Sequence, residues 1–288
     1  FSFISGPCSL KLRQPASSGA VGFMAEEPRD VAAALGFDVE EGDALAYKAD
    51  YTPPTALSCG LIMVPHGKTQ SNNEHLFQDH SDSALSQLLP EGVEMARRGA
   101  AEFVQQYAES MKGNLDTWVL YRTPLSRTTT TADCYVAALR EAGVEVPDPI
   151  VDPLLLEINQ GSWAGLSVDG LAAAGREQDA VLARAYRDAS FFAKATDGSG
   201  ESKLDVLRRS ADWLRVLEAR HGSAKCNVLV FGHGTFQNCV ELLLKCYPDK
   251  SAADIFNRNP SGGSHLRRGE VHILTPLHVH ASDADAKL

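Results

Sequence analysis

The sequence lacks a long apolar run and an excess of basic residues, and each absence excludes a class of protein. No apolar stretch in its 288 residues approaches the roughly 20 that a helix needs to cross a bilayer. The formal net charge is -10, which argues against a nucleic-acid or anionic-membrane surface. A local basic pocket could still bind an anion. We therefore expect no transmembrane segment and no nucleic-acid partner.

Cysteine pairs of the CxxC type are also missing. The six cysteines are scattered through the chain at Cys8, Cys59, Cys134, Cys226, Cys239 and Cys246. This spacing fits neither a zinc site nor a dense disulfide scaffold. Most of these residues lie beside apolar neighbours, so we expect buried free thiols. Free thiols favour a reducing compartment, and we expect a cytoplasmic or organellar protein that is not secreted.

Residues 1–58 differ in character from the rest of the chain. Residues 1–20 contain Ser, Ala, Lys and Arg but no acid, which fits either the remnant of an organelle-targeting peptide or an ordinary chain end. Residues 27–35 predict a short helix, and the two prolines within 52–55 predict an extended linker. We expect an extension that packs on a main domain formed by residues 59–288.

From Cys59 onward, apolar strands alternate with helical stretches. The predicted strands are 60–64, 117–121, 151–157, 227–231 and 270–274. The predicted helices are 91–111, 128–142, 204–221 and 236–246, and residues 166–199 are also helical in character. Such alternation predicts an α/β fold with a mostly parallel central sheet and helices on both faces.

Two of the predicted strands run into a histidine that is followed by glycine. The first ends in Pro65-His66-Gly67, and the second in Gly232-His233-Gly234. Ligands bind at the carboxyl ends of the strands in an open α/β sheet, and glycine lets backbone and ligand approach closely. A single loop histidine would carry little weight. Two at the same rim favour a shared site.

Two other strand ends add a cation and a carboxylate. Arg122 and Arg127 flank the turn that leads into the helix at 128, where a guanidinium suits an oxyanion because it binds in two-pronged fashion. Glu157 follows an apolar run, and burial there would let it hold a proton as a general acid. The competing interpretations are surface arginines and a structural carboxylate. Taken together, these residue types would bind a phosphoryl group, attack it and protonate the leaving oxygen.

Five short motifs occur in a fixed order along residues 59–274. They are Pro65-His66-Gly67-Lys68-Thr69 with Asn72, Thr123-Pro124-Leu125-Ser126-Arg127 running on to Ala132, Glu157 with Gly161 and Trp163-Ala164-Gly165, Gly200-Glu201-Ser202, and Phe231-Gly232-His233-Gly234. In this set and order the chain resembles the histidine phosphatase superfamily, which includes the phosphoglycerate mutases.

The resemblance implies a role for each matching residue. His66 would be the nucleophile that becomes phosphohistidine, and Glu157 would be the acid for the leaving group and then the base for water. His233, Arg127 and Asn72 would hold the phosphoryl oxygens. The remaining phosphate-site candidates are Gly67, Lys68 and Arg122. The resemblance also implies a small phosphorylated partner, no cofactor and no metal.

Two positions depart from the superfamily pattern. Pro65 stands where the superfamily has arginine, and Lys68 stands where it has glutamate. Proline has neither a charge nor a backbone N–H, and losing one such charged donor costs on the order of 10²–10³ in rate. Lys68 or Arg122 could restore the charge, although lysine lacks the guanidinium fork.

Three functions follow from this pattern, in order of preference. The first is a phosphatase of weakened activity that hydrolyses a small phosphoester. The alternative is a catalytically impaired pseudoenzyme that serves as a binding or scaffold subunit of a larger complex. A mutase ranks third, because the stretch from Glu157 to Gly200 looks shorter than in that branch. We expect residues 166–199 to form a modest cap over the pocket.

Overall fold

A computed structural model describes residues 27–256 and 267–278 of the chain. Its centre is a five-stranded sheet in the order β5-β4-β6-β3-β7. The strands are β3 (Gly60–Pro65), β4 (Trp118–Arg122), β5 (Ile150–Val151), β6 (Asn227–Gly232) and β7 (His272–Ile273). Strands β3, β4, β5 and β6 pair in parallel, and β7 pairs antiparallel with β3. The predicted mostly parallel sheet is therefore confirmed.

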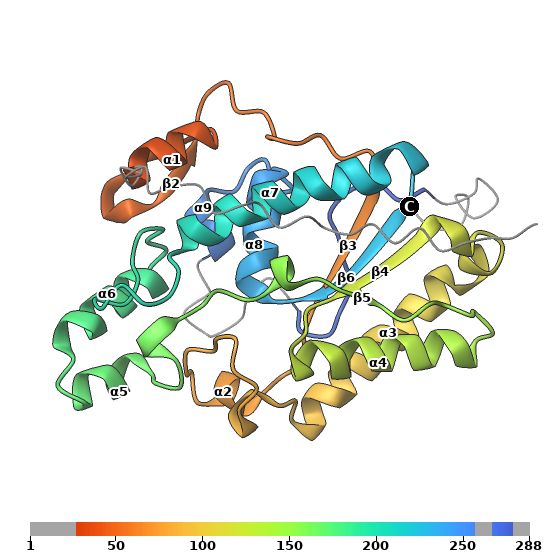
Figure 1. Cartoon of the computed structure of the whole chain (residues 1–288), viewed down its shortest axis with the longest axis horizontal. Helices are drawn as coiled ribbons and strands as arrows, with labels where there is room; N and C mark the ends of the chain where they lie inside the picture. The colour runs from red at the N-terminus through yellow and green to blue at the C-terminus, as the bar shows by residue number, and fades with distance from the viewer. Residues whose placement is uncertain (1–26, 257–266, 279–288) are drawn as a thin grey trace, which may run out of the picture.

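Helices cover both faces of the sheet (Figure 1). On one face lie α3 (Pro90–Lys112) and α4 (Ser126–Glu141), and on the other lie α7 (Lys203–His221) and α8 (Gly234–Leu243). Successive residues of β3 alternate between the two layers, so that Ile62 and Val64 pack toward α3 and α4 while Leu61 and Met63 pack toward α7 and α8. Burial on both faces explains why β3 and β6 read as unbroken apolar runs.

The extension forms the predicted short helix and a hairpin that the sequence of residues 37–51 did not predict. Helix α1 (Pro28–Ala34), which confirms the short helix expected over 27–35, leads into β1 (Phe37–Val39) and β2 (Leu45–Tyr47). Phe37 and Leu45 belong to the same core as α7 and α8. The Tyr51 hydroxyl donates to the Leu243 carbonyl at 2.6 Å, which fastens the extension to the end of α8.

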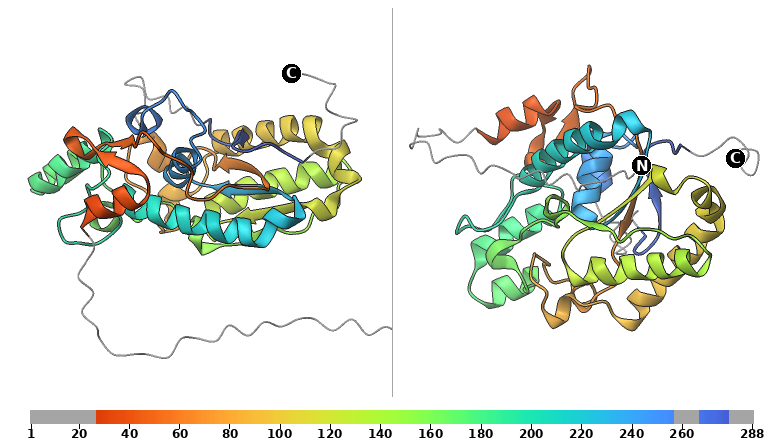
Figure 2. Two further views of the ribbon diagram at one scale, coloured as in Figure 1. Left: turned by 90° about the horizontal axis from the view of Figure 1, so that it is seen from above. Right: turned by 45° about the vertical axis from the view of Figure 1, so that its right-hand side comes forward.

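The remaining helices are short and lie outside the sheet. They are α2 (Gln70–Asn73), α5 (Val168–Ala173), α6 (Glu177–Arg187) and α9 (Ala252–Phe256). Helices α5 and α6 confirm the helical character expected of residues 166–199. The views in Figure 2 place α5 and α6 at the same end of the molecule as the extension. The segment after α6 contacts the extension directly, because the Phe191 amide donates to the Asp43 carbonyl at 3.0 Å.

The predicted strand over 151–157 is wrong beyond its first residue. Strand β5 ends at Val151, and Pro153–Leu155 form a single 3-10 turn. Pro153 cannot donate a backbone hydrogen bond to a neighbouring strand, and the Asp152 carboxylate accepts from the Leu154 amide at 3.0 Å to close the turn. The following leucines therefore belong to a loop, and Glu157 does not stand at a strand end.

Several features expected from composition can be checked on the part of the chain that the structure describes. Its five cysteines are free thiols, and three of them, Cys59, Cys226 and Cys239, are buried. The sixth, Cys8, and the rest of residues 1–20 lie outside the described residues. None of the described helices combines the length and apolarity needed to span a membrane. No group of three described His, Cys, Asp or Glu side chains could hold a metal ion.

Candidate active site

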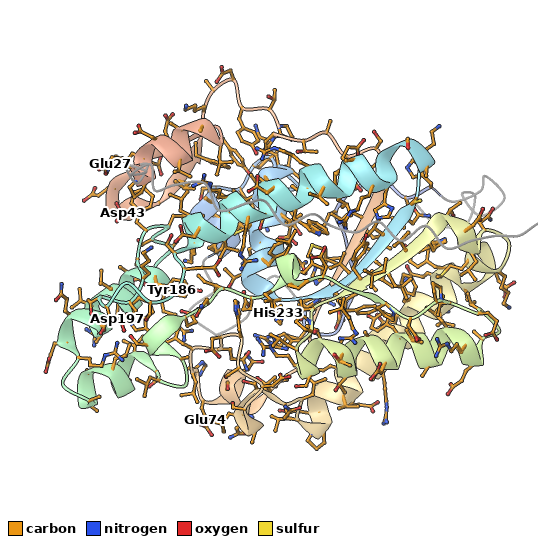
Figure 3. The ribbon with its side chains drawn as sticks, viewed as in Figure 1. Glu27, Asp43, Glu74, Tyr186, Asp197 and His233 are labelled. Carbon is orange, nitrogen blue, oxygen red and sulfur yellow. The ribbon has the colours of Figure 1, made fainter. Side chains whose placement is uncertain are left out.

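The pairing of β3 with β6 brings the two histidines together. Pro65 lies opposite Gly232 in the parallel register, and the His66 amide donates to the Gly232 carbonyl at 3.0 Å. Each histidine is the next residue after its strand. Their rings meet edge to face, with centroids 5.3 Å apart, and both are buried. His233, labelled in Figure 3, lies where β6 passes into α8.

A backbone carbonyl selects the tautomer of His66. Its Nδ1 lies 2.7 Å from the carbonyl oxygen of Gly67. Because a carbonyl only accepts, Nδ1 must carry the hydrogen, and the lone pair of the neutral ring is then on Nε2.

Gly67 keeps this turn close to α3. A Cβ on Gly67 would lie 2.2 Å from the carbonyl oxygen of Gly92, so a side chain there would push the helix away. The Gly67 amide donates to the Thr131 hydroxyl at 3.2 Å. The structure therefore gives Gly67 a packing role beside His66, and its N–H already has a partner.

One ring nitrogen of His233 has a hydrogen-bond partner among the described residues, and the other has none. Its Nε2 lies 3.1 Å from the Thr123 hydroxyl, which also bonds the Thr128 hydroxyl at 2.6 Å. Its Nδ1 is buried and has no hydrogen-bond partner among the described residues. Burial, followed by the electrostatic influence of the neighbouring Arg127 and His66, holds the pKa of His233 well below its usual value. An anion bound among these groups would favour the protonated ring.

Arg127 is the strongest sign that an anion belongs here. Its side chain is completely buried in the first turn of α4. One guanidinium nitrogen, Nη2, donates to the Asp79 carbonyl at 2.8 Å, whereas Nε and Nη1 have no partner among the described residues. Burial lowers the pKa of Arg127, although nearby Glu157 opposes that shift. A buried guanidinium with two nitrogens whose N–H groups are unsatisfied is costly unless an oxyanion completes it.

Glu157 reaches the site from the loop after β5. One carboxylate oxygen accepts from the Ile158 amide at 2.9 Å, and the other from the Thr235 amide at 3.3 Å. Thr235 lies in the first turn of α8, two residues after His233. The carboxylate therefore faces the same helix start as the histidine pair. The predicted strand end is wrong, but the predicted residue is brought to the site.

The structure engages the other three predicted phosphate-site side chains elsewhere. The Asn72 amide oxygen accepts from the Thr69 amide at 3.1 Å in a capping box that begins α2. The Lys68 ammonium pairs with Glu91 at 2.9 Å. The Arg122 guanidinium bonds the Thr129 hydroxyl at 2.8 Å and lines a separate hollow of about 360 Å³.

Sequence reasoning missed the loop that covers Arg127. Besides the Asp79 carbonyl on Arg127, the Asp82 carboxylate accepts from the Ser126 amide at 3.0 Å, and His80 Nε2 lies 2.6 Å from the Glu157 carbonyl. Residues 78–82 form an irregular polar stretch with no hydrophobic period. Their only signal was their place shortly after Asn72.

The chain belongs to the histidine phosphatase superfamily (branch 1), whose family model matches residues 61–261. A search of curated proteins found no match. Among solved structures, a mycobacterial glucosyl-3-phosphoglycerate phosphatase in complex with VO3 is 24% identical with a TM-score of 0.50, covering 67% of this chain and 84% of its own. Bacillus stearothermophilus YhfR is 22% identical with a TM-score of 0.51, covering 65% and 80%. Mycobacterial hydrolase 1 is 22% identical with a TM-score of 0.50, covering 67% and 83%. These likenesses support the fold.

Proposed function

We propose that this protein is a phosphatase that hydrolyses a small phosphoester through a phosphohistidine at His66. The observation that carries the proposal is the buried guanidinium of Arg127, whose Nε and Nη1 have no partner among the described residues. It lies in the same site as two buried histidines and the Glu157 carboxylate. Phosphoryl transfer depends mainly on positioning and on positive charge around the phosphoryl oxygens, and this arrangement offers both.

The reaction has two steps with complementary proton movements. In the first, the Nε2 lone pair of His66 attacks phosphorus, the ester P–O bond breaks, and protonated Glu157 gives its proton to the departing oxygen. In the second, the Glu157 carboxylate takes a proton from water, the resulting hydroxide attacks phosphorus, and the P–N bond breaks with its electron pair returning to Nε2. Arg127 and protonated His233 neutralise the phosphoryl oxygens in both steps.

Pro65 sets the expected level of activity. Its carbonyl accepts from the Gly269 amide at 2.7 Å, and its ring offers no donor to an oxyanion. The proposed site holds one guanidinium, Arg127, where the superfamily pattern has two arginines. We therefore expect turnover lower by on the order of 10²–10³ than in a site with both cations.

Rapid chemical quench tests the proposal directly. The protein is mixed with radiolabelled phosphoesters, quenched in alkali to preserve phosphohistidine, and digested to locate the label. The panel includes glucosyl-3-phosphoglycerate, the compound in the name of one structural neighbour. Label is expected on His66, lost in His66→Ala and retained in His75→Asn, a control at an exposed histidine. Absence of trapped label together with absence of hydrolysis across the panel would refute the phosphatase.

The second candidate is a pseudoenzyme that binds a phosphorylated ligand or protein, and Pro65 is the observation that favours it. Calorimetry with inorganic phosphate separates the two functions. Binding that is lost in Arg127→Ala, without label on His66 or turnover, supports the pseudoenzyme. Copurification with a partner in a fixed ratio would identify the scaffold function.

A further inference from the structure

We propose that Arg209 and Glu201 are positioning residues for the Glu157 acid, an inference that rests on the proposed phosphatase activity. The Gly200-Glu201-Ser202 motif stands at the start of α7, and Arg209 follows two turns later on the same helix. None of these residues belongs to the cluster of His66, His233 and Arg127. Their side chains instead hold the loop from which Glu157 projects.

That loop has little regular structure of its own. After the turn at Pro153–Leu155, residues 156–160 belong to neither a strand nor a helix. Arg209 supplies part of the missing support, because its Nη1 donates to the Leu154 carbonyl and its Nη2 to the Glu157 carbonyl, both at 3.0 Å. A single guanidinium thus grips the backbone of the loop at the acid and three residues before it.

Glu201 is the second residue that holds this loop, and we call the pair the Arg209–Glu201 clamp. Its two oxygens accept from Arg209 Nε at 2.8 Å and Nη2 at 3.2 Å, a two-pronged pair whose side chains are only 20% and 24% exposed. The same carboxylate accepts from the Asn159 amide at 2.8 Å, and the Glu201 amide donates to the Asn159 carbonyl at 2.7 Å. The loop is therefore tied down on both sides of Glu157.

The geometry of this contact explains why residue 200 is a glycine. Its φ is +87°, and a Cβ there would lie 2.6 Å from the Asn159 carbonyl oxygen. Only glycine combines that conformation with so close an approach to the loop. The motif thus supplies a close contact through Gly200, a carboxylate for Arg209 through Glu201, and the cap of α7 through Ser202.

The Arg209–Glu201 clamp also contacts α8, the helix whose first turn bonds the Glu157 carboxylate. The Arg209 guanidinium lies over the Phe236 ring of α8, 5.3 Å from its centroid. The first turn of α8 donates to the Glu157 carboxylate through Thr235. Because Glu201 balances its charge, Arg209 acts on Glu157 mainly by placing the backbone. Releasing that backbone would move the acid away from the leaving oxygen without removing His66 or Arg127.

The dependence on leaving group tests this role. Dinitrophenyl phosphate has a leaving group that departs without a proton, whereas phenyl phosphate needs the acid. For Arg209→Gln we expect kcat/KM to fall about 10- to 100-fold with phenyl phosphate and less than about 3-fold with dinitrophenyl phosphate. Arg209→Lys should recover part of the loss. Arg215→Gln is the matched control, because Arg215 lies on α7 with an exposed side chain paired to Asp212. Equal losses with both esters would overturn the proposal.

A double substitution removes the remaining ambiguity. If Arg209 acts through Glu157, Arg209→Gln should cause no further loss with phenyl phosphate when Glu157 is already Gln. Losses that multiply would show an independent structural effect and would contradict the proposed role.

Amide hydrogen exchange separates failure of this inference from failure of the proposed function. A native protein that traps no label on His66 and hydrolyses no ester refutes the phosphatase. The clamp itself is then judged on the Ile158 and Asn159 amides, which should exchange at least about 10-fold faster in Arg209→Gln than in Arg215→Gln. Unchanged exchange would show that Arg209 does not hold the loop.

Discussion

The two halves of the candidate site are built in different ways. His66, His233 and Arg127 each stand next to or within a regular element, so the backbone hydrogen bonds of β3, β6 and α4 place them. Glu157 stands in an irregular loop and depends on side chains from distant segments, above all Arg209 and Glu201. Substitutions in the regular half should therefore remove a reacting or charged group. Substitutions that disturb the loop should instead misplace Glu157.

The largest effect is expected from Arg127→Ala. It removes a cation that the proposed site has only once, so kcat/KM should fall by at least about 10³ and affinity for inorganic phosphate should fall in parallel. Arg140→Ala is the matched control, because Arg140 lies on α4 but its guanidinium forms an exposed pair with Asp148. Steady-state kinetics and calorimetry measure both. Unchanged phosphate affinity in Arg127→Ala would remove the main support for the site.

A smaller effect, now on placement, is expected from Gly200→Ala. The substituted residue must keep a φ near +87° and also meets the Asn159 carbonyl, so we expect a loss of more than about 2 kcal/mol in unfolding free energy and weaker turnover of esters that need an acid. Gly198→Ala is the control, because its φ is +75° but nothing lies within 4 Å of its Cβ position. It should cost about 1–2 kcal/mol from backbone strain alone. Denaturant unfolding distinguishes them, and equal costs would contradict the close contact at Gly200.

Low pH should lower the stability of the segment that follows the Glu157 loop along the chain, where Asp179 titrates. The Asp179 carboxylate accepts from Trp163 Nε1 and from the Thr196 amide, each at 2.9 Å, and pairs with Arg176. Burial alone would raise the pKa of Asp179, but these hydrogen bonds outweigh it and lower the pKa from 3.8 to about 2. Because the folded pKa is below the unfolded value, the stabilisation is complete above about pH 4 and is lost as the pH falls toward 2.

Thermal unfolding across this pH range measures that contribution. The fall in Tm between pH 4 and 2 should be smaller in Asp179→Asn, which cannot titrate there. Asp212→Asn on the exposed surface of α7 is the control and should follow the native curve. Identical slopes for the native protein and Asp179→Asn would contradict the assignment.

The same contrast explains which parts could be predicted. An apolar run that ends in His-Gly is a local signal, so β3, β6 and both histidines could be predicted from short stretches. The position of Glu157 is set by a carbonyl contact with Arg209, 52 residues away along the chain, and such a contact leaves no local pattern. The run Leu154-Leu155-Leu156 even favoured a strand, because its apolar character outweighed the turn signal of Asp152 and Pro153. Asn72 matched a motif, and its side-chain oxygen accepts from the Thr69 amide in the capping box that begins α2.

The smallest effect is expected from Lys68→Ala, which tests whether the regular half recovers the charge missing at Pro65. The Lys68 ammonium pairs with Glu91, and the two side chains are 32% and 52% exposed. An exposed pair of this kind contributes about 0–1 kcal/mol to stability, and a cation held there by a carboxylate is not directed at the phosphoryl oxygens. Both kcat/KM and phosphate affinity should therefore stay within about 3-fold of the native values, in Lys68→Ala as in the control Glu91→Gln. A larger loss in Lys68→Ala alone would mean that Lys68 leaves Glu91 for the bound anion. Recognition of the phosphoryl group would then be shared between a fixed guanidinium and a mobile ammonium.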